Sequence, residues 1–272
     1  MKRKAVKILS LLAPNLVVNF AYKMITTPQI SKLRPHELDI LDTAVKEIYP
    51  YKGFDIQCYI WTGGNKKILL VHGWEGQAGN FADIILRLQK ENYTIYAFDG
   101  PSHGFSSKGK TSLMEFTELV GIFIDKFEVS DIISHSFGGV ATTYALFANQ
   151  NLKIDKYILI TTPDKFIERI DYVAHQVGIT KRVKSRLIQR LEKETNMEVN
   201  LLNVSEFVKQ IQVNKAWIFH DIADKIIPIT QSRAVLKNWK NAELIEITGT
   251  GHFRILRTPW VIDSIIQKLK SD

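Results

Sequence analysis

The stretch Asp131–Gly139 combines an apolar run, a serine and two glycines in an order that suits a nucleophile. Ser136 stands between small residues, with Ser134 two positions before it and Gly138 two positions after it. A serine hydroxyl becomes a useful nucleophile when a tight strand-to-helix turn projects it toward a base, and small neighbours let the helix pack on the strand. Turns of this kind usually have glycine two positions before the nucleophile. Ser134 stands there instead, which weakens the pattern, because serine adopts positive φ less readily than glycine. The stretch predicts attack on a carbonyl carbon by Ser136, and a plain turn after a buried strand is the structural alternative.

Serine chemistry also requires a base and a group that orients it, and both residue types follow Ser136 in the chain. Among seven histidines, His252 alone follows the last predicted strand in a short glycine-rich loop, from which a base can reach the serine. Two carboxylates, Asp221 and Asp224, lie just after the preceding predicted strand. On position alone, either aspartate could orient the histidine.

Predicted strands and helices alternate from residue 46 onward. The strand patterns cover 47–51, 54–61, 67–71, 94–98, the run before Ser136, 157–161, 216–220 and 242–247. Helical patterns cover about 80–90, 112–126 and 259–270. The first two strands suit an antiparallel edge pair, and the later alternation predicts a mostly parallel, doubly wound sheet. Because ligands of such sheets bind at the carboxyl ends of the strands, polar loops there mark the expected site: 72–76, 99–104 and 220–224.

More than fifty residues separate the sixth predicted strand from the seventh, which is too many for a plain crossover helix. We interpret about 164–214 as a small helical cap inserted after the sixth strand. Its basic residues between 181 and 193 indicate a solvated helix face, and a surface that attracts anionic substrates is the functional alternative. Apolar cap residues at helical spacing indicate cap core, with an acyl pocket as the alternative.

Composition limits the class of protein. The chain has 272 residues and 45% hydrophobic content, enough for one α/β domain. A lone cysteine, Cys58, excludes an internal disulfide and a thiolate metal cluster, and it fits a reducing, cytoplasmic location. The net charge of +8 is distributed unevenly along the chain. Residues 1–36 contain seven of the 36 basic residues and no acidic residue, so the remainder of the chain contains 29 basic and 28 acidic residues. A nucleic-acid partner is therefore not expected.

Residues 1–45 are predicted to form a basic amphipathic helical arm, followed by the main domain at 46–272. Apolar residues recur at near-helical spacing, but Lys7, Pro14 and Asn15 interrupt them, which disfavours a transmembrane helix. The same interruptions disfavour a signal peptide and hence secretion. We favour an arm packed on the body. Peripheral contact of residues 1–25 with an anionic membrane is the alternative.

Taken together, these motifs resemble the α/β-hydrolase superfamily, in particular its serine esterase and lipase-like members, over roughly residues 45–272. The resemblance implies an α/β-hydrolase fold with its nucleophile, acid and histidine in that chain order, as Ser136, Asp224 and His252 are. It also favours Asp224 over Asp221, because Pro228 follows Asp224 as in the superfamily pattern. The motifs that carry it are His72-Gly73-Trp74, Ser134–Gly138, Asp224–Pro228 and Gly251-His252.

The resemblance implies a role for each residue. Ser136 attacks, His252 accepts its proton and later donates it to the leaving group, and Asp224 orients the imidazole. The backbone N–H groups of Trp74 and Phe137 form the oxyanion hole. Dehalogenase and epoxide hydrolase activities are disfavoured, because both need an aspartate where Ser136 stands.

We therefore predict a serine hydrolase that cleaves a carboxylic ester or thioester of small or medium acyl size through an acyl-enzyme. Acyltransferase, amidase, perhydrolase and carbon–carbon hydrolase activities use the same groups. A non-catalytic or membrane-surface binding protein that retains the fold is the alternative from another class. No metal, nucleotide or organic cofactor is implied, and the sequence does not define the oligomeric state.

Overall fold

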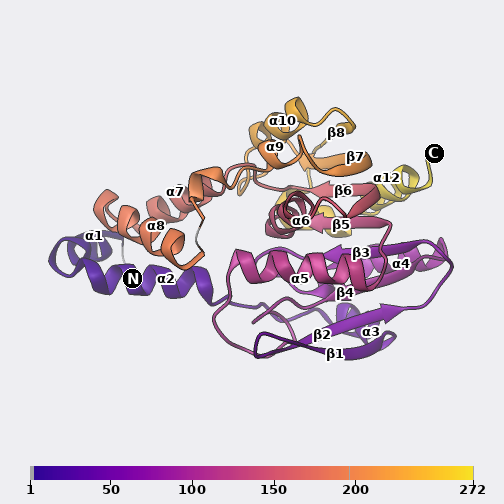
Figure 1. Ribbon diagram of the computed structural model, residues 1–272, viewed down its shortest axis with the longest axis horizontal. Coiled ribbons are helices and arrows are strands. Elements are labelled where there is room, and N and C mark those ends of the chain that lie inside the picture. The colour runs from indigo at the N-terminus through magenta and orange to yellow at the C-terminus, as the bar shows by residue number, and fades with distance from the viewer. Residues whose placement is uncertain (1–2, 196, 272) are drawn as a thin grey trace. The chain divides into compact units, whose positions relative to one another are not determined.

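A computed structural model describes residues 3–195 and 197–271 of the chain. Its contacts divide the chain into two units (Figure 1). The larger unit comprises residues 29–164 and 204–272 and contains the sheet, whereas the smaller unit comprises residues 1–28 and 165–203 and is helical.

One eight-stranded sheet organises the larger unit, in the order β1-β2-β4-β3-β5-β6-β7-β8. β1 pairs antiparallel with β2 and β2 with β4, and all other neighbours are parallel. This arrangement confirms the predicted mostly parallel sheet and its antiparallel edge pair. The strands are β1 (Val45–Tyr51), β2 (Phe54–Trp61), β3 (Lys67–Val71), β4 (Thr94–Phe98), β5 (Asp131–His135), β6 (Lys153–Ile160), β7 (Gln212–Asp221) and β8 (Ala242–Ile247).

Helices cover both faces of this sheet. On one face α3 (Pro35–Asp42), α4 (Ala82–Lys90) and α12 (Pro259–Lys270) bury apolar residues against the strands, together with the short helices η1 (Ala78–Phe81) and η3 (Ile255–Arg257). On the other face lie α5 (Leu113–Lys126), α6 (Phe137–Ala148), α9 (Val204–Phe207) and α10 (Ile229–Asn238), with α5 packed on α6 (Figure 1). The sheet is therefore doubly wound, as predicted.

Local sequence signals account for where the predicted helices begin. Ser112 caps α5: its hydroxyl accepts the Glu115 N–H at 3.2 Å, while the Glu115 carboxylate accepts the Ser112 N–H at 3.1 Å. Pro259 begins α12, at a position where its missing N–H costs no hydrogen bond. These caps explain why the sequence placed both helices to within a residue.

The smaller unit combines two segments that are far apart in sequence. Helices α1 (Arg3–Leu12) and α2 (Pro14–Thr26) pack with α7 (Phe166–Val177) and α8 (Lys181–Thr195), and η2 (Val199–Leu201) completes the unit. A small buried core joins Val6, Val17 and Val18 of the arm to Val183 of the inserted segment. The helical insertion after the sixth strand is thus confirmed, and the arm packs against it.

The chain passes between the two units after residues 28, 164 and 203, so α3 belongs to the larger unit, which contains the sheet. These boundaries do not coincide with the sequence boundaries at 45/46 and about 164–214, which stay predictions. None of the helices in the described ranges has an apolar stretch long enough to cross a lipid bilayer.

A buried carboxyl at the start of β5 makes the stability of the larger unit depend on pH. Burial, reinforced by the negative charge of Asp155, raises the pKa of Asp131 to about 6. Because the pKa of an unfolded aspartate is near 3.9, the protonated carboxyl favours the folded state below that pH. This contribution, at most about 3 kcal/mol, is lost as the pH rises through about 6.

We expect Asp131→Asn to raise the free energy of unfolding at pH 7 and to change it little at pH 4. Urea unfolding at the two pH values measures the difference, with Asp125→Asn, at an exposed position, as the control. Equal effects of Asp131→Asn at both pH values would contradict this account.

Candidate active site

The nucleophile candidate lies in a strained turn between β5 and α6. Ser136 has φ 52° and ψ −121°. This is a positive-φ conformation that residues other than glycine rarely adopt. Its N–H donates to the Ile160 carbonyl at 2.9 Å, and its carbonyl accepts the Gly139 N–H at 2.9 Å. These bonds hold the backbone of Ser136 in the strained conformation, which projects its hydroxyl away from the end of β5. The sequence predicted such a tight strand-to-helix turn, which is called a nucleophile elbow.

Close backbone approach explains the glycines after Ser136. A Cβ on Gly138 would lie 2.4 Å from the His72 carbonyl oxygen, and one on Gly139 would lie 2.0 Å from Thr162 Oγ1. Ser134 substitutes for the usual first glycine without strain, because it lies within β5, where its hydroxyl bonds the Tyr157 hydroxyl at 2.8 Å. The departure from the common pattern therefore leaves the turn intact.

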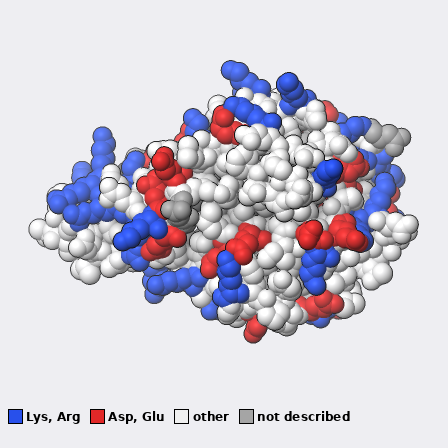
Figure 2. Space-filling view, viewed as in Figure 1, with Lys and Arg blue, Asp and Glu red and all other residues white. Residues whose placement is uncertain are grey.

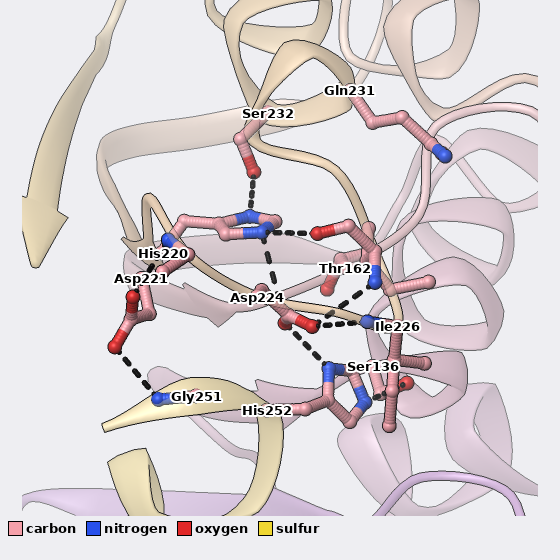
Figure 3. Close-up of polar contacts among 12 residues, drawn as sticks. Ser136, Thr162, His220, Asp221, Asp224, Ile226, Gln231, Ser232, Gly251 and His252 are labelled. Carbon is pink, nitrogen blue, oxygen red and sulfur yellow. Dashed lines mark hydrogen bonds and ion pairs between the residues drawn. The ribbon is translucent and has the colours of Figure 1, made fainter. Parts of the chain in front are cut away.

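Three side chains from separate parts of the chain form one hydrogen-bonded line (Figure 3): Ser136 in the turn before α6, Asp224 after β7 and His252 in the short helix α11 (Gly251–Arg254). His252 Nε2 lies 3.1 Å from Ser136 Oγ, and His252 Nδ1–H donates to Asp224 Oδ2 at 2.7 Å. The other Asp224 oxygen accepts the N–H groups of Ile226 at 2.7 Å and Ile227 at 3.1 Å. The structure thus brings together the three residues predicted from the sequence, and their catalytic roles stay a prediction at this point.

The charge state of Asp224 suits this arrangement. Burial alone would raise the pKa of its carboxyl, but the hydrogen bond and charge of His252 and the two backbone N–H groups outweigh it and lower the pKa. Asp224 is therefore ionised near neutral pH. An ionised carboxylate accepts only, which fixes the proton of His252 on Nδ1 and leaves Nε2 free to accept from Ser136.

Asp221, the rival acid, has a different set of partners. One of its oxygens accepts the Thr250 N–H at 2.5 Å, the Thr250 hydroxyl at 2.9 Å and the Gly251 N–H at 2.7 Å. The other accepts the Ala223 N–H at 2.8 Å. Burial opposes its ionisation, yet these bonds lower the pKa of Asp221. Asp221, the last residue of β7, therefore anchors the start of the short helix that carries His252, a role that sequence reasoning missed because nothing local marks the partners of a carboxylate at a strand end.

Two further histidines support the site in their neutral form. His135 Nε2–H donates to the His252 carbonyl at 3.0 Å, and burial, with the adjacent His252, lowers the pKa of His135 to about 3. His220 donates to the Ile227 carbonyl at 2.9 Å and accepts from the Ser232 hydroxyl at 2.6 Å, and burial lowers its pKa. Both rings fill and brace the site without being placed to take a proton from Ser136.

Other polar residues of the predicted edge hold the loops together. His72 donates to the Gly73 carbonyl at 2.7 Å and accepts the Gly100 N–H at 2.9 Å. Asp99 accepts from the N–H groups of Ala78 and Phe105, each at 2.8 Å, and is fully buried. Asp99 is therefore a structural carboxylate.

The two predicted oxyanion-hole residues are Phe137, which follows the serine, and Trp74, which follows Gly73, where a Cβ would lie 3.1 Å from Ser136 Cβ. Phe137 is the first residue of α6, where an N–H has no acceptor within the helix, and Trp74 follows β3 in a turn. Among the hydrogen bonds of residues 3–195 and 197–271, neither backbone N–H donates. The rings of Trp74 and Phe137 meet edge to face, with their centroids 5.3 Å apart. The Phe116 ring also meets Phe137 edge to face, with a centroid distance of 5.3 Å. An apolar wall thus adjoins two free donors.

Comparison with known families agrees with this architecture. Residues 68–263 match the model of the alpha/beta hydrolase family, and the chain belongs to that family. The match extends from β3 to α12 and contains all three residues of the hydrogen-bonded line.

Among curated proteins, a pimeloyl-acyl-carrier protein methyl ester esterase of Stenotrophomonas maltophilia strain K279a is 30% identical over 112 residues. The alignment covers 41% of this chain, and the chain spans only 41% of the length of that esterase. Two solved structures share the fold: an esterase of Pyrococcus furiosus (TM-score 0.65, 17% identity, 92% of this chain and 97% of that one) and a membrane phospholipase A described as a bacterial virulence factor (TM-score 0.65, 13% identity, 99% and 98%).

Proposed function

We propose that this member of the hydrolase family is a serine hydrolase that cleaves a carboxylic ester or thioester through an acyl-enzyme. The observation that carries the proposal is the continuous line from Ser136 Oγ through His252 to the ionised Asp224, together with unpaired N–H groups on Phe137, the next residue, and on Trp74. This geometry supplies a nucleophile, a base, an orienting carboxylate and donors for an oxyanion, the set that acyl transfer requires.

In the proposed acylation step, His252 Nε2 accepts the Ser136 proton as Oγ attacks the carbonyl carbon. The negative charge that develops on the carbonyl oxygen is stabilised by the N–H groups of Trp74 and Phe137, while Asp224 stabilises the imidazolium. His252 then donates its proton to the departing alcohol or thiol, and the acyl group remains on Ser136. In deacylation His252 takes a proton from water as the water oxygen attacks the carbonyl carbon of the ester on Ser136. The bond between that carbon and Ser136 Oγ then breaks, His252 returns the proton to Oγ, and the carboxylic acid leaves.

Two of the similar proteins carry the name esterase, which favours an ester over an amide as the proposed substrate bond. The half-buried rings of Trp74 and Phe137, with the fully buried Phe116 behind Phe137, give an apolar surface that suits a small or medium acyl group. Acyltransferase, amidase and carbon–carbon hydrolase activities remain alternatives that use the same residues. A purely binding role is disfavoured, because it gives no reason for strain at Ser136.

A fluorophosphonate probe tests the proposal, because it bonds covalently to a serine hydroxyl only where a base activates it. We expect stoichiometric labelling of the native chain and its disappearance in Ser136→Ala. Ser185→Ala is the matched control, since that hydroxyl bonds only the Lys181 carbonyl of its own helix. An unlabelled native protein would favour a binding role. For a labelled protein, rates on p-nitrophenyl esters of increasing chain length would then measure the depth of the acyl pocket.

A further inference from the structure

The arm helices have two apolar faces, of which only one is covered. Val6, Val17 and Val18 are buried in the core of the smaller unit. The opposite face also carries large apolar side chains, and we call these six the exposed ridge: Ile8, Leu11, Leu12, Leu16, Phe20 and Met24, with exposed fractions of 58, 70, 79, 64, 46 and 37%.

Helical spacing aligns the members of the ridge. Positions 8, 11 and 12 share a face of α1, and positions 16, 20 and 24 follow each other by four residues along α2. Six of the sixteen large apolar side chains that are exposed in the described residues therefore lie on these two helices. Scattered exposed apolar residues need no explanation, whereas large apolar side chains aligned along a helix face mark an interaction surface.

The smaller unit also carries the entire net charge of the protein. Residues 1–28 and 165–203 contain 13 basic and 5 acidic residues, which equals the net charge of +8, and the remainder of the chain contains 23 of each. Exposed lysines accompany the ridge at Lys7 and Lys23. Figure 2 shows Lys and Arg gathered over the region in which Figure 1 places α1 and α8.

Helix α8 brings part of this charge alongside α2. Arg186 and Arg190 donate to the side-chain oxygens of Asn15 and Asn19 at 2.9 and 2.8 Å. Each asparagine lies one residue before a ridge position of α2, Asn15 before Leu16 and Asn19 before Phe20, so the cationic helix borders the exposed apolar row. Arg190 also forms an ion pair with Glu194, but Lys181, Arg182 and Lys193 of α8 are exposed.

We infer that the exposed ridge of α1 and α2 is a docking surface for an anionic phospholipid membrane. The leucines and Phe20 enter the interface between head groups and acyl chains, and the flanking lysines and α8 cations bind lipid phosphates. At ten and thirteen residues, both helices are too short to span a bilayer and lie in its plane. This docking is additional to the proposed ester hydrolysis and does not depend on it.

Charge and apolarity together select this partner. A second copy of the chain would bring two units of charge +8 together, which opposes association through this surface. A nucleic acid would be attracted by the cations, but it offers no apolar layer to cover the exposed leucines of α1. An anionic membrane satisfies both features at once.

Vesicle co-sedimentation of the full chain tests the inference, with phosphatidylcholine alone compared with equal parts phosphatidylcholine and phosphatidylglycerol. We expect the native chain to pellet with the anionic vesicles and to remain in the supernatant with the neutral ones. The combined variant Leu11→Ser, Leu12→Ser, Leu16→Ser and Phe20→Ser should lower the partition coefficient at least about tenfold. Lys7→Glu with Lys23→Glu should lower it by about twentyfold or more on anionic vesicles.

Matched controls separate docking from general stickiness and from misfolding. Leu38→Ser with Leu86→Ser removes two exposed leucines from helices of the sheet-bearing unit and should leave pelleting unchanged. Far-ultraviolet circular dichroism and the melting temperature report whether each variant folds. Pelleting of the ridge variant like the native chain would overturn the inference, as would equal binding to neutral vesicles. Binding abolished by a DNA competitor but unaffected in the ridge variant would indicate a nucleic acid, and a ridge-dependent dimer that ignores vesicles would indicate a second copy.

Discussion

Ser136→Ala is expected to lower kcat on an ester substrate about ten-thousand-fold while KM changes little, because the variant lacks the atom that would form the proposed acyl-enzyme. His252→Ala should have an effect of the same size, since Ser136 Oγ then has no base within 3.1 Å. The residual rate comes from the donors at Trp74 and Phe137, which still stabilise an oxyanion formed by direct attack of water. Steady-state kinetics on a p-nitrophenyl ester measures both.

Combining the two changes distinguishes a shared step from separate contributions. Because serine and histidine act on one proton transfer in the proposed acylation step, the double variant should be about as slow as either single variant. Losses that multiply would indicate that the residues act independently, and the proposed acylation step would then be wrong. Ser185→Ala, which alters a hydroxyl bonded within its own helix, should retain the native rate.

Asp224→Asn is expected to lower kcat by about the same factor of ten thousand. An asparagine amide would donate toward His252 Nδ1, which would move the imidazole proton to Nε2 and prevent that atom from accepting the Ser136 proton. The backbone would change little, because the asparagine oxygen can still accept the Ile226 and Ile227 N–H groups. The loss should therefore occur without a matching fall in melting temperature.

Asp221→Asn is the matched comparison, because Asp221 lies three residues before Asp224, at the end of β7. It weakens the bonds that hold Thr250 and Gly251, so we expect a lower melting temperature and a decrease in kcat of about ten- to hundredfold from a displaced His252. If Asp221→Asn proved more damaging to kcat than Asp224→Asn, the assignment of the acid would be reversed.

Much of the fold followed from local signals in the sequence. The eight strands, the capped helices α5 and α12 and the helical insertion after β6 were predicted, because buried strands are apolar runs and helix ends carry recognisable residues. The turn at Ser136 was also readable, since Gly138 must be small where the helix crosses the His72 carbonyl. Helix α10, in contrast, was not predicted.

Interactions between distant segments were decided only by the tertiary structure. The sequence offered two aspartates, and the fold gives Asp224 to the His252 imidazole and Asp221 to the backbone that carries it. The fold likewise joins the arm to α8, about 165 residues later in the chain, by placing Val17 and Val183 in one buried apolar cluster. The physical reason is the same in both cases: residue type and periodicity determine what a side chain can bind and which face is apolar. Which partner it meets depends on how the whole chain closes its core.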